Sequence, residues 1–516
     1  MSIVLLEPPR PENPSRFEDV VNAPLSACLF TGYISAVLHA HKIEAVTVNA
    51  YLYDWSIEQT ISDISKKNPL LLCVHIVYLW ERTQDIFDML STIKSKNLAM
   101  HINLYGYYPT FVYKNILGDF SFIDSVTVGE PEFTTLELAR HILQNRDSHE
   151  ICIPGLAYRN NQGKVVFSLR PPVQDLDQLP YPRRQDIELY KKKGIVTYIQ
   201  GSRGCYGHCT FCYLNPFYDR VGQWRGRSAQ NIFEEMLVLF NEHSVDNFYF
   251  SDANFFGPGR SGKERAITLA ELILAHDMDI RFGFECRAND IETHSISKLV
   301  MAGLTNVFLG LESGDQASLK RFRKHTTVDE NKRAIQLLRE YGIEPTYGFI
   351  MFEPNSNMKS IRNNFEFLKE AGIMTNPAVT AHVLYHKQTL FAGTPDYQAI
   401  IQESPGDGNT FSNYEAMYTI KDPKVEAFSQ IIAHLCKTTL SLLPATYDCN
   451  KNALSCVTAS ASLEATVNDA LIALFEKTLV YFETNTQGNF SDTIREMKQK
   501  LTDEMKTVIQ PLSFIH

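Results

Sequence analysis

Three cysteines crowd into one short loop, and this loop constrains the chain more than any other stretch. Cys205, Cys209 and Cys212 are separated by three residues and then by two, within Gly201-Ser202-Arg203-Gly204-Cys205-Tyr206-Gly207-His208-Cys209-Thr210-Phe211-Cys212. Glycines lie before and between the cysteines, where the chain must bend tightly if several thiolates are to point to one centre. Three thiolates can bind three irons of a cubane cluster and leave the fourth iron open to a ligand that is not protein.

A zinc site or a chance cluster of cysteines is the alternative interpretation. Structural zinc takes four ligands, usually from two separated pairs, and no second cysteine pair follows Cys212 in the sequence. The spacing, directly after the apolar run Ile195–Ile199, resembles the cluster-binding signature of the radical S-adenosylmethionine (SAM) superfamily. This resemblance implies a [4Fe–4S] cluster on Cys205, Cys209 and Cys212, with SAM on the open iron.

Length and charge limit the remaining possibilities. A chain of 516 residues is long enough for two or three domains, and a formal net charge of −10 argues against nucleic-acid binding. We find no apolar run long enough to span a bilayer, and the stretch before Pro8 is too short and too acidic for a signal peptide. The other cysteines are scattered singly, as in proteins of a reducing compartment. We expect a cytoplasmic protein without a membrane or nucleic-acid partner and without a disulfide framework.

Residues 1–150 alternate apolar strand patterns with helical patterns. The expected strands are Ile3–Leu6, Ala45–Leu52, Leu70–Val77, Met100–Tyr105 and Val126–Val128, and the expected helices are Ser26–His41, Ile57–Lys66, Gln84–Lys96 and Thr134–Leu143. This alternation predicts an α/β domain with an open, doubly wound parallel sheet. Ligands of such sheets lie at the carboxyl ends of the strands, which here carry Glu7, Tyr78, Trp80, Gly106 and Gly129. A G-x-G-x-x-G fingerprint is missing, which argues against a nicotinamide dinucleotide.

The first domain is similar to the cobalamin-binding, Rossmann-like domain of class B radical SAM enzymes. The likeness lies in the domain order, the strand count, the glycine after the fourth strand and the turn Gly129-Glu130-Pro131-Glu132. The Asp-x-His-x-x-Gly motif, whose histidine binds cobalt in other cobalamin proteins, is absent, as it is in many class B members. The resemblance implies cobalamin at Gly106 and Gly129, with Tyr78 or Trp80 below the corrin. Alternatively, these aromatic residues only pack a domain interface.

Residues 151–194 are expected to connect the first domain to a second one. A hairpin is predicted over Leu156–Leu169, followed by a proline-rich segment.

Residues 195–395 alternate strand and helix patterns again. Expected strands are Ile195–Ile199, Asn247–Ser251, Ile280–Glu285, Asn306–Leu311, Pro345–Phe352 and Ala378–Leu384, with helices between them. Six such units predict a partial (β/α)6 barrel.

Ligands of barrels also lie at the carboxyl ends of the strands, and these ends supply candidate SAM contacts. They are Ser251, Asp252, Glu285, Arg287, Gly310 and Glu312. Leu309-Gly310-Leu311-Glu312-Ser313-Gly314 resembles an element that supports SAM in the superfamily, and Phe211 matches an aromatic position next to the adenine. The alternatives are a direct Glu312–Arg287 ion pair and a helix cap at Asp252. Cys286 is either a radical quencher or a buried structural thiol.

Residues 396–516 carry long amphipathic patterns over Val425–Leu443, Leu463–Thr484 and Asp492–Ile509, which predict a C-terminal helical domain. The resemblance as a whole implies a class B radical SAM methyltransferase. A 5′-deoxyadenosyl radical would attack an unactivated carbon of a small molecule, cobalamin would carry the methyl group, and an external flavodoxin or ferredoxin would supply electrons. The alternative is a cobalamin-containing radical SAM enzyme that catalyses cyclisation, ring rearrangement or oxidation without methyl transfer. The sequence predicts neither the substrate nor further catalytic residues.

Overall fold

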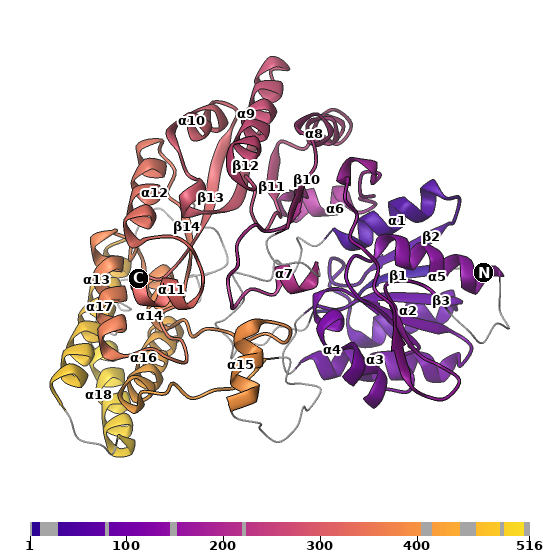
Figure 1. Cartoon of the computed structure of the whole chain (residues 1–516). Coiled ribbons are helices and arrows are strands. Elements are labelled where there is room, and N and C mark those ends of the chain that lie inside the picture. The colour runs from indigo at the N-terminus through magenta and orange to yellow at the C-terminus, as the bar shows by residue number, and fades with distance from the viewer. Residues whose placement is uncertain are drawn as a thin grey trace.

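The computed structural model describes residues 3–10, 29–77, 82–144, 152–218, 223–403, 415–443, 461–485 and 490–509. Along the chain, a first α/β sheet is followed by a second, barrel-like sheet and then by a group of helices (Figure 1). The first sheet and the helical region lie on opposite sides of the barrel-like sheet in this view. The expected fold class is confirmed.

The first sheet has seven strands in the order β2-β1-β3-β4-β5-β6-β7. The five predicted strands form its parallel part, and they are β1 (Ile3–Glu7), β2 (Ala45–Asn49), β3 (Leu71–His75), β4 (His101–Tyr105) and β5 (Ser125–Thr127). The predicted hairpin, β6 (Leu156–Arg159) and β7 (Val165–Phe167), extends this sheet in antiparallel fashion. The order 2-1-3-4-5 changes direction between β1 and β3, which is where ligands of such sheets bind.

Alternating side chains of β1 bury two separate cores. Val4 and Leu6 pack with α2 (Ile57–Lys67), α3 (Thr83–Lys96) and α4 (Tyr107–Asp119) on one face. Ile3 and Leu5 pack with α1 (Phe30–Ala40) and α5 (Glu132–Gln144) on the other. Because both faces are covered, the strands read as continuous apolar runs. The sequence analysis did not predict α4, which begins at Tyr107 directly after its N-cap Gly106. Three of the predicted positions, Ser26, Tyr78 and Trp80, lie outside the described residues.

The second sheet has five parallel strands in the order β14-β13-β12-β11-β8. They are β8 (Thr197–Ile199), β11 (Asn247–Phe250), β12 (Arg281–Arg287), β13 (Leu304–Glu312) and β14 (Thr346–Phe349). Its helices are α8 (Ala229–His243), α9 (Gly259–Ala275), α10 (Thr293–Met301), α12 (Val328–Glu340) and α13 (Met358–Glu370). Together they form an incomplete barrel.

The prediction of a sixth strand at Ala378–Leu384 is wrong. This run lies in α14 (Pro377–Tyr385), whose N-cap Asn376 accepts hydrogen bonds from two backbone N–H groups and is followed by proline at the first helical position. An asparagine cap and an N-terminal proline are strong helix-start signals, and a short apolar run cannot by itself tell a strand from a buried helix. Beyond β14, one bridge pairs Phe352 with Lys387.

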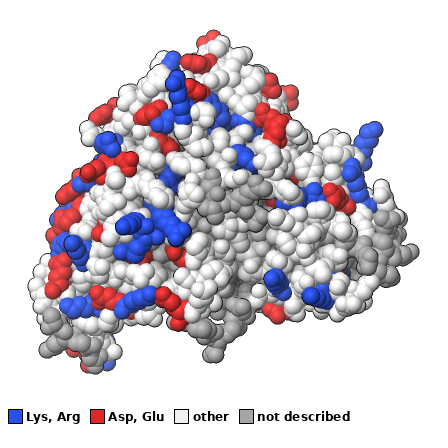
Figure 2. All heavy atoms as spheres, viewed as in Figure 1, with Lys and Arg blue, Asp and Glu red and all other residues white. Residues whose placement is uncertain are grey.

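The predicted C-terminal helices are confirmed as α16 (Pro423–Leu442), α17 (Ala461–Thr484) and α18 (Ser491–Ile509). Of these, α16 and α17 pack on α14, α17 also contacts α13, and α18 packs on α16 and α17; all three continue the apolar core of the barrel. None of the helices in the described part of the chain combines the length and the apolar character needed to cross a bilayer. Figure 2 shows basic and acidic side chains interspersed over the barrel and the C-terminal helices, whereas the first domain carries few charges on this face.

A buried ion-pair network joins the two sheets. Arg203 lies in a short ribbon formed by β9 (Ser202–Gly204) and β10 (Trp224–Gly226), and its side chain is 1% exposed. Its guanidinium lies 2.5 Å from the carboxylate of Glu132, the first residue of α5, and 3.4 Å from that of Glu130 in the turn before this helix. Arg225 of β10 completes the network at 2.6 Å from Glu130. Buried charges are tolerated only when they are paired, so this network fixes the ribbon against the first domain.

We expect Arg203→Leu to lower the free energy of unfolding by about 3–5 kcal/mol, because it leaves the fully buried Glu132 carboxylate without its closest cation. The midpoint of urea unfolding measures this loss. Arg495→Leu removes an exposed partner of Asp492 and should change the same quantity by less than about 0.5 kcal/mol. The double variant Arg203→Leu/Glu132→Leu should be more stable than Arg203→Leu. An Arg203→Leu protein as stable as the Arg495→Leu control would contradict a stabilising role for the network.

Candidate functional site

The cysteine loop follows β9 and places its three thiols around one cavity. The backbone N–H of Gly207 donates to Cys205 Sγ at 3.3 Å. Gly204 has a φ of +76°, and a Cβ at this position would overlap the carbonyl oxygen of Gln223. A Cβ on Gly207 would lie 2.6 Å from Arg287 Nη1. Gly204 is therefore required by its left-handed backbone and by close backbone approach, whereas Gly207 leaves room for the Arg287 guanidinium.

The cysteines fit a cluster that contains several metal atoms. Burial raises the pKa of the Cys205 and Cys212 thiols, against the opposing effect of nearby backbone N–H groups. Metal binding offsets this effect because it holds cysteines as thiolates. Among the described residues, no group of three His, Cys, Asp or Glu side chains is arranged to hold a single metal ion. The three thiols instead stand around a shared cavity, which suits a wider body such as a cubane cluster.

Five of the predicted SAM contacts line this same cavity: Phe211, Glu285, Arg287, Gly310 and Glu312. They come from the cysteine loop and from the carboxyl ends of β12 and β13. The Phe211 ring lies edge-on to Phe322 at 5.4 Å. The structure thus brings together residues that are far apart in the sequence, next to the three thiols. Their contacts with SAM stay a prediction.

Arg287 and Glu312 do not pair with each other. Arg287 lies 3.6 Å from Cys209 Sγ through Nη1 and donates through Nη2 to the backbone carbonyl of Lys324. The partner of Glu312 is the Lys324 ammonium, at 2.7 Å. Glu312 sits on an irregularity of β13 and has a φ of +64°, a left-handed conformation that is rare outside glycine. Such strain is typical of functional positions.

Gly310 leaves room for this ion pair. A Cβ at Gly310 would lie 2.8 Å from both Glu312 Oε1 and Lys324 Nζ. A glycine is therefore favoured at this position because the neighbouring side chains leave no room for a Cβ, and not because of its own backbone conformation.

Ser251 and Asp252 are not among the residues that line the cavity. Asp252 accepts hydrogen bonds from the Gly201 N–H and the Ser202 hydroxyl, each at 2.7 Å, and caps no helix. Burial, opposed mainly by Arg265, raises the pKa of Asp252 to about 6. The Ser251 N–H donates to the Ile199 carbonyl at 2.9 Å. The structure therefore places both residues under the start of the cysteine loop, which they hold in position.

Among the acids that line the cavity, Glu285 has the weakest electrostatic compensation for a buried negative charge, because Glu312 is paired with Lys324. Burial, and to a smaller extent the charge of Asp252, raises the pKa of Glu285 to about 8. Cys286 also lines the cavity, and burial raises the pKa of its thiol. A buried thiol of this kind is unreactive, which favours the structural interpretation of Cys286.

Sequence reasoning missed Lys324, His386 and Gln388, which also line the cavity. Lys324 follows α11 (Gln316–Arg321), and its spacing from Glu312 carries no motif. His386 ends the helix that was mistaken for a strand. Burial and the nearby His382 lower the pKa of His386 to about 3, so its imidazole is neutral. Recognising the helix-start signal at Asn376-Pro377 would have pointed to His386 as a helix-end residue.

The first domain meets the cysteine loop through an aromatic wall. Gly106 has a φ of +120° where β4 turns into α4, and the N–H of Gly129 donates to the Thr110 hydroxyl at 3.1 Å. Tyr107, next to Gly106, packs 5.1 Å from Tyr213, which directly follows Cys212. The carboxyl ends of the first sheet therefore face the cysteine loop. The loop of Tyr78 and Trp80, predicted to lie below a corrin, is outside the described residues.

Comparison with known proteins gives a family match for part of the chain and a fold for nearly all of it. Residues 199–368 match the model of the radical SAM superfamily. The chain is 28% identical over 362 residues to an anaerobic magnesium-protoporphyrin IX monomethyl ester cyclase of Rubrivivax gelatinosus, an alignment that covers 67% of this chain and 62% of the relative. It is 24% identical over 382 residues to a 4′-phospho-dehydrooxetanocin synthase of Priestia megaterium, covering 70% of this chain and 50% of the relative. The chain thus spans less than two thirds of the length of either relative.

Two solved structures share the whole fold. OxsB, a cobalamin-dependent SAM radical enzyme, superposes with a TM-score of 0.76 at 18% identity and covers 99% of this chain and 80% of its own. TsrM from Kitasatospora setae, a radical SAM methyltransferase, gives a TM-score of 0.67 at 15% identity and covers 97% of this chain and 99% of its own. The family match includes the cysteine loop and four of the five barrel strands in full. Residues 199–368 thus match the radical SAM superfamily, and nearly the whole chain has the fold of two solved radical SAM enzymes, one of which is described as cobalamin-dependent.

Proposed function

We propose that this protein is a cobalamin-dependent radical SAM methyltransferase that acts on an unactivated carbon of a small molecule. The proposal rests on one observation. The carboxyl ends of the strands of the first sheet face the cysteine loop of the barrel, and Tyr107 and Tyr213 are in contact between them. OxsB, which has this fold, was solved with cobalamin and SAM bound. TsrM, which also has it, is described as a methyltransferase.

Cys205, Cys209 and Cys212 would hold the [4Fe–4S] cluster, and Glu285, Arg287 and Glu312 would contact SAM. When bound, these cofactors supply a 5′-deoxyadenosyl radical, and cobalamin supplies a methyl group. The chain itself orients the cofactors and excludes water. Arg287 keeps a positive charge against Cys209, and Lys324 holds Glu312 in its strained position. An external flavodoxin or ferredoxin would deliver the electron.

A second candidate function is radical chemistry without methyl transfer. The relative from Rubrivivax gelatinosus is named a cyclase, and a cyclase would use the same cluster, SAM and corrin sites. The two functions differ in the fate of the methyl group of SAM. Labelled methionine fed to the host, followed by comparison of metabolites with those of a deletion strain, separates them. A product that carries the labelled methyl group supports methyl transfer, and an unlabelled product that depends on the gene supports the second function.

We expect Cys209→Ala to abolish formation of 5′-deoxyadenosine and to lower cluster iron content several-fold, because two thiolates hold a cubane weakly. Iron analysis, the visible absorption of the cluster and chromatography of the reaction measure this. Cys286→Ala is the matched control in the same cavity and should keep the cluster. A corrin absorption band in both variants, purified from cobalamin-fed cells, would show a separate cobalamin site. Wild-type protein with a reduced cluster that never cleaves SAM, with or without corrin, would overturn the enzyme proposal.

Gly310→Ala should weaken SAM binding about tenfold, roughly 1.4 kcal/mol, because its Cβ would displace the Glu312–Lys324 ion pair. Cluster content should stay unchanged. Equilibrium dialysis with labelled SAM measures the affinity. Gly118→Ala in α4 is the control, since no heavy atom lies within 4 Å of its new Cβ; it should bind SAM like wild type. Equal SAM affinity in the two variants would contradict a role for the ion pair in SAM binding.

Glu285→Gln should stabilise the SAM-free protein, increasingly so as the pH rises. The pKa of Glu285 is about 8 in the folded protein and near 4.5 when unfolded, so the folded wild type holds an extra proton between these values and loses stability as the pH rises through this window. The variant lacks this loss. Its advantage in the free energy of unfolding, measured by urea denaturation, should be small at pH 5, grow up to about pH 8 and then level off, reaching more than about 1.4 kcal/mol. An exposed change, Glu264→Gln in α9, serves as control. A Glu285→Gln advantage that does not vary with pH would contradict the raised pKa.

A further inference from the structure

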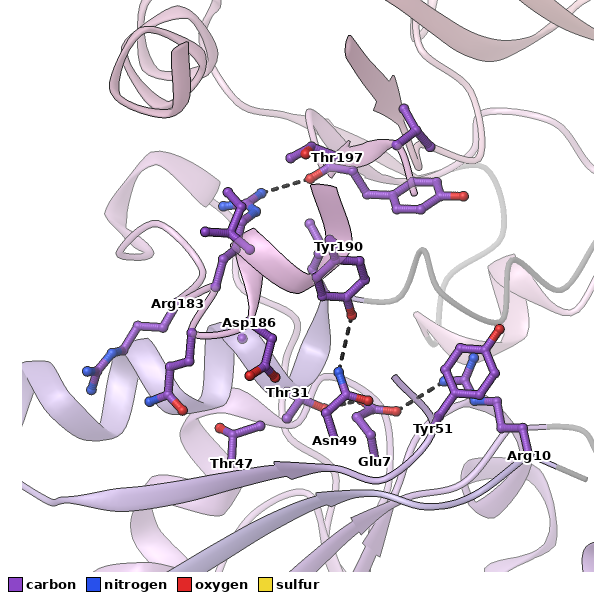
Figure 3. Close-up of a pocket in the computed structure, with 17 residues that line it drawn as sticks. Glu7, Arg10, Thr31, Thr47, Asn49, Tyr51, Arg183, Asp186, Tyr190 and Thr197 are labelled. Atoms are coloured by element: carbon purple, nitrogen blue, oxygen red, sulfur yellow. Dashed lines mark hydrogen bonds and ion pairs between the residues drawn. The ribbon is translucent and has the colours of Figure 1, made fainter. Parts of the chain in front are cut away.

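A second cavity shares no lining residue with the cofactor cavity (Figure 3). It lies at the carboxyl ends of β1 and β2 and beside the first turn of α1. The chain segment that leads into the barrel closes it, including α6 (Ile187–Lys192). In Figure 3, Glu7, Arg10 and Tyr51 lie at one end, and Tyr190 reaches down to Asn49 near the middle. The proposed function uses none of these residues.

Arg10 is a buried cation of this cavity with unused donors. Its side chain is 5% exposed, and its Nη2 lies 3.1 Å from Glu7 Oε2. Its Nε and Nη1 atoms are buried and have no hydrogen-bond partner among the residues that the structure describes. Its guanidinium also lies over the Tyr51 ring, 4.4 Å from the centroid. Buried donors of a charged group that lack a partner are costly, so they point to a ligand with acceptor oxygens.

The first turn of α1 adds a second feature that favours an anion. Leu29, Thr31 and Gly32, at the start of this 11-residue helix, line the cavity, and the N-cap Leu29 provides no side-chain hydrogen bond. Helix N-termini attract anions because their first N–H groups have no partner within the helix. A Cβ on Gly32 would lie 2.9 Å from the Arg183 carbonyl, so glycine lets the connecting segment close over this end.

Glu7 does not take the place of such an anion. Its carboxylate is held by His75 Nδ1 at 2.9 Å, by the Thr31 hydroxyl and by Arg10 Nη2. Burial opposes the charge, but His75 and Arg10 lower the pKa of Glu7, so that it stays ionised. These contacts are made with side chains and leave Arg10 Nε and Nη1 unused.

The rest of the cavity offers polar groups suited to hydroxyls. Asn49 Nδ2 donates to the Tyr190 hydroxyl at 3.2 Å, and Asp186 accepts from the Tyr53 hydroxyl at 2.9 Å. We propose that this cavity binds a small metabolite that carries a phosphate or carboxylate group together with hydroxyl groups, with Arg10 as its principal anion-binding side chain. The inference does not rest on the proposed function.

The test uses the full-length protein with its cluster reconstituted, and it probes binding of inorganic phosphate and glycerol 3-phosphate by phosphorus NMR line broadening. We expect glycerol 3-phosphate to bind more tightly than phosphate, and Arg10→Gln to weaken both at least tenfold. Arg10→Lys keeps the charge and the Glu7 partner, and it should retain part of the affinity. Arg260→Gln, which removes a guanidinium 92% exposed on α9, should bind both probes within twofold of wild type.

Three results would overturn the proposal. The first is the absence of binding to wild type below about 10 mM of either probe. The second is an Arg10→Gln variant that binds like the Arg260→Gln control. The third is loss of binding when the protein is saturated with hydroxocobalamin, because the anion would then be the phosphodiester of the corrinoid and not a free metabolite. Thermal melting of each variant without ligand verifies that it is folded.

Discussion

The ion pairs of Arg203 with Glu130 and Glu132 are the contact on which the arrangement of the two sheets depends. Both faces of β1 are covered and the barrel has an apolar core of its own, whereas Tyr213 and Phe391 from the second part of the chain pack in a core of the first sheet. Four charged side chains, all less than 10% exposed, join the β9–β10 ribbon to the turn after β5 and the first residue of α5, beside the aromatic contact of Tyr107 with Tyr213. Charges buried this deeply tolerate few alternative geometries, because a displaced partner leaves an uncompensated charge.

Much of the fold follows from the sequence. The five parallel strands of the first sheet and the barrel strands are predicted because strands buried on both faces read as continuous apolar runs. The error at Ala378–Leu384 has the same origin, since a buried helix such as α14 gives a similar run. The Asn376-Pro377 pair distinguishes a helix from a strand here, but it is a local signal, whereas the prediction relied on a sixth strand–helix unit. The helix α4 was not predicted, because glycine followed by two tyrosines and a proline is not a typical helix start.

The site is predictable where it depends on spacing and unpredictable where it depends on long-range pairing. The three cysteines and the strand-end residues Glu285, Arg287, Gly310 and Glu312 share one cavity because parallel strands end at the same edge. The partner of Glu312 is Lys324. This pairing depends on the path of the chain after α11, which the sequence does not predict. Ser251 and Asp252 also follow a strand, yet Asp252 turns toward Gly201 and Ser202. Hydrogen bonds with nearby residues decide where a side chain at a strand end points, and the apolar pattern of the sequence does not predict these bonds.

The position of Arg203 within β9 has a consequence for how the protein acquires its metal. Arg203 precedes Cys205 by two residues, and Gly204 between them is fixed by its left-handed backbone. Docking of the two domains and shaping of the cysteine loop therefore act on the same few peptide units. In a chain whose domains have not docked, the thiols would follow a strand that lacks this anchor, which would couple cluster binding to the docking of the domains. Damage at the inter-domain contact would consequently first be seen as protein poor in iron.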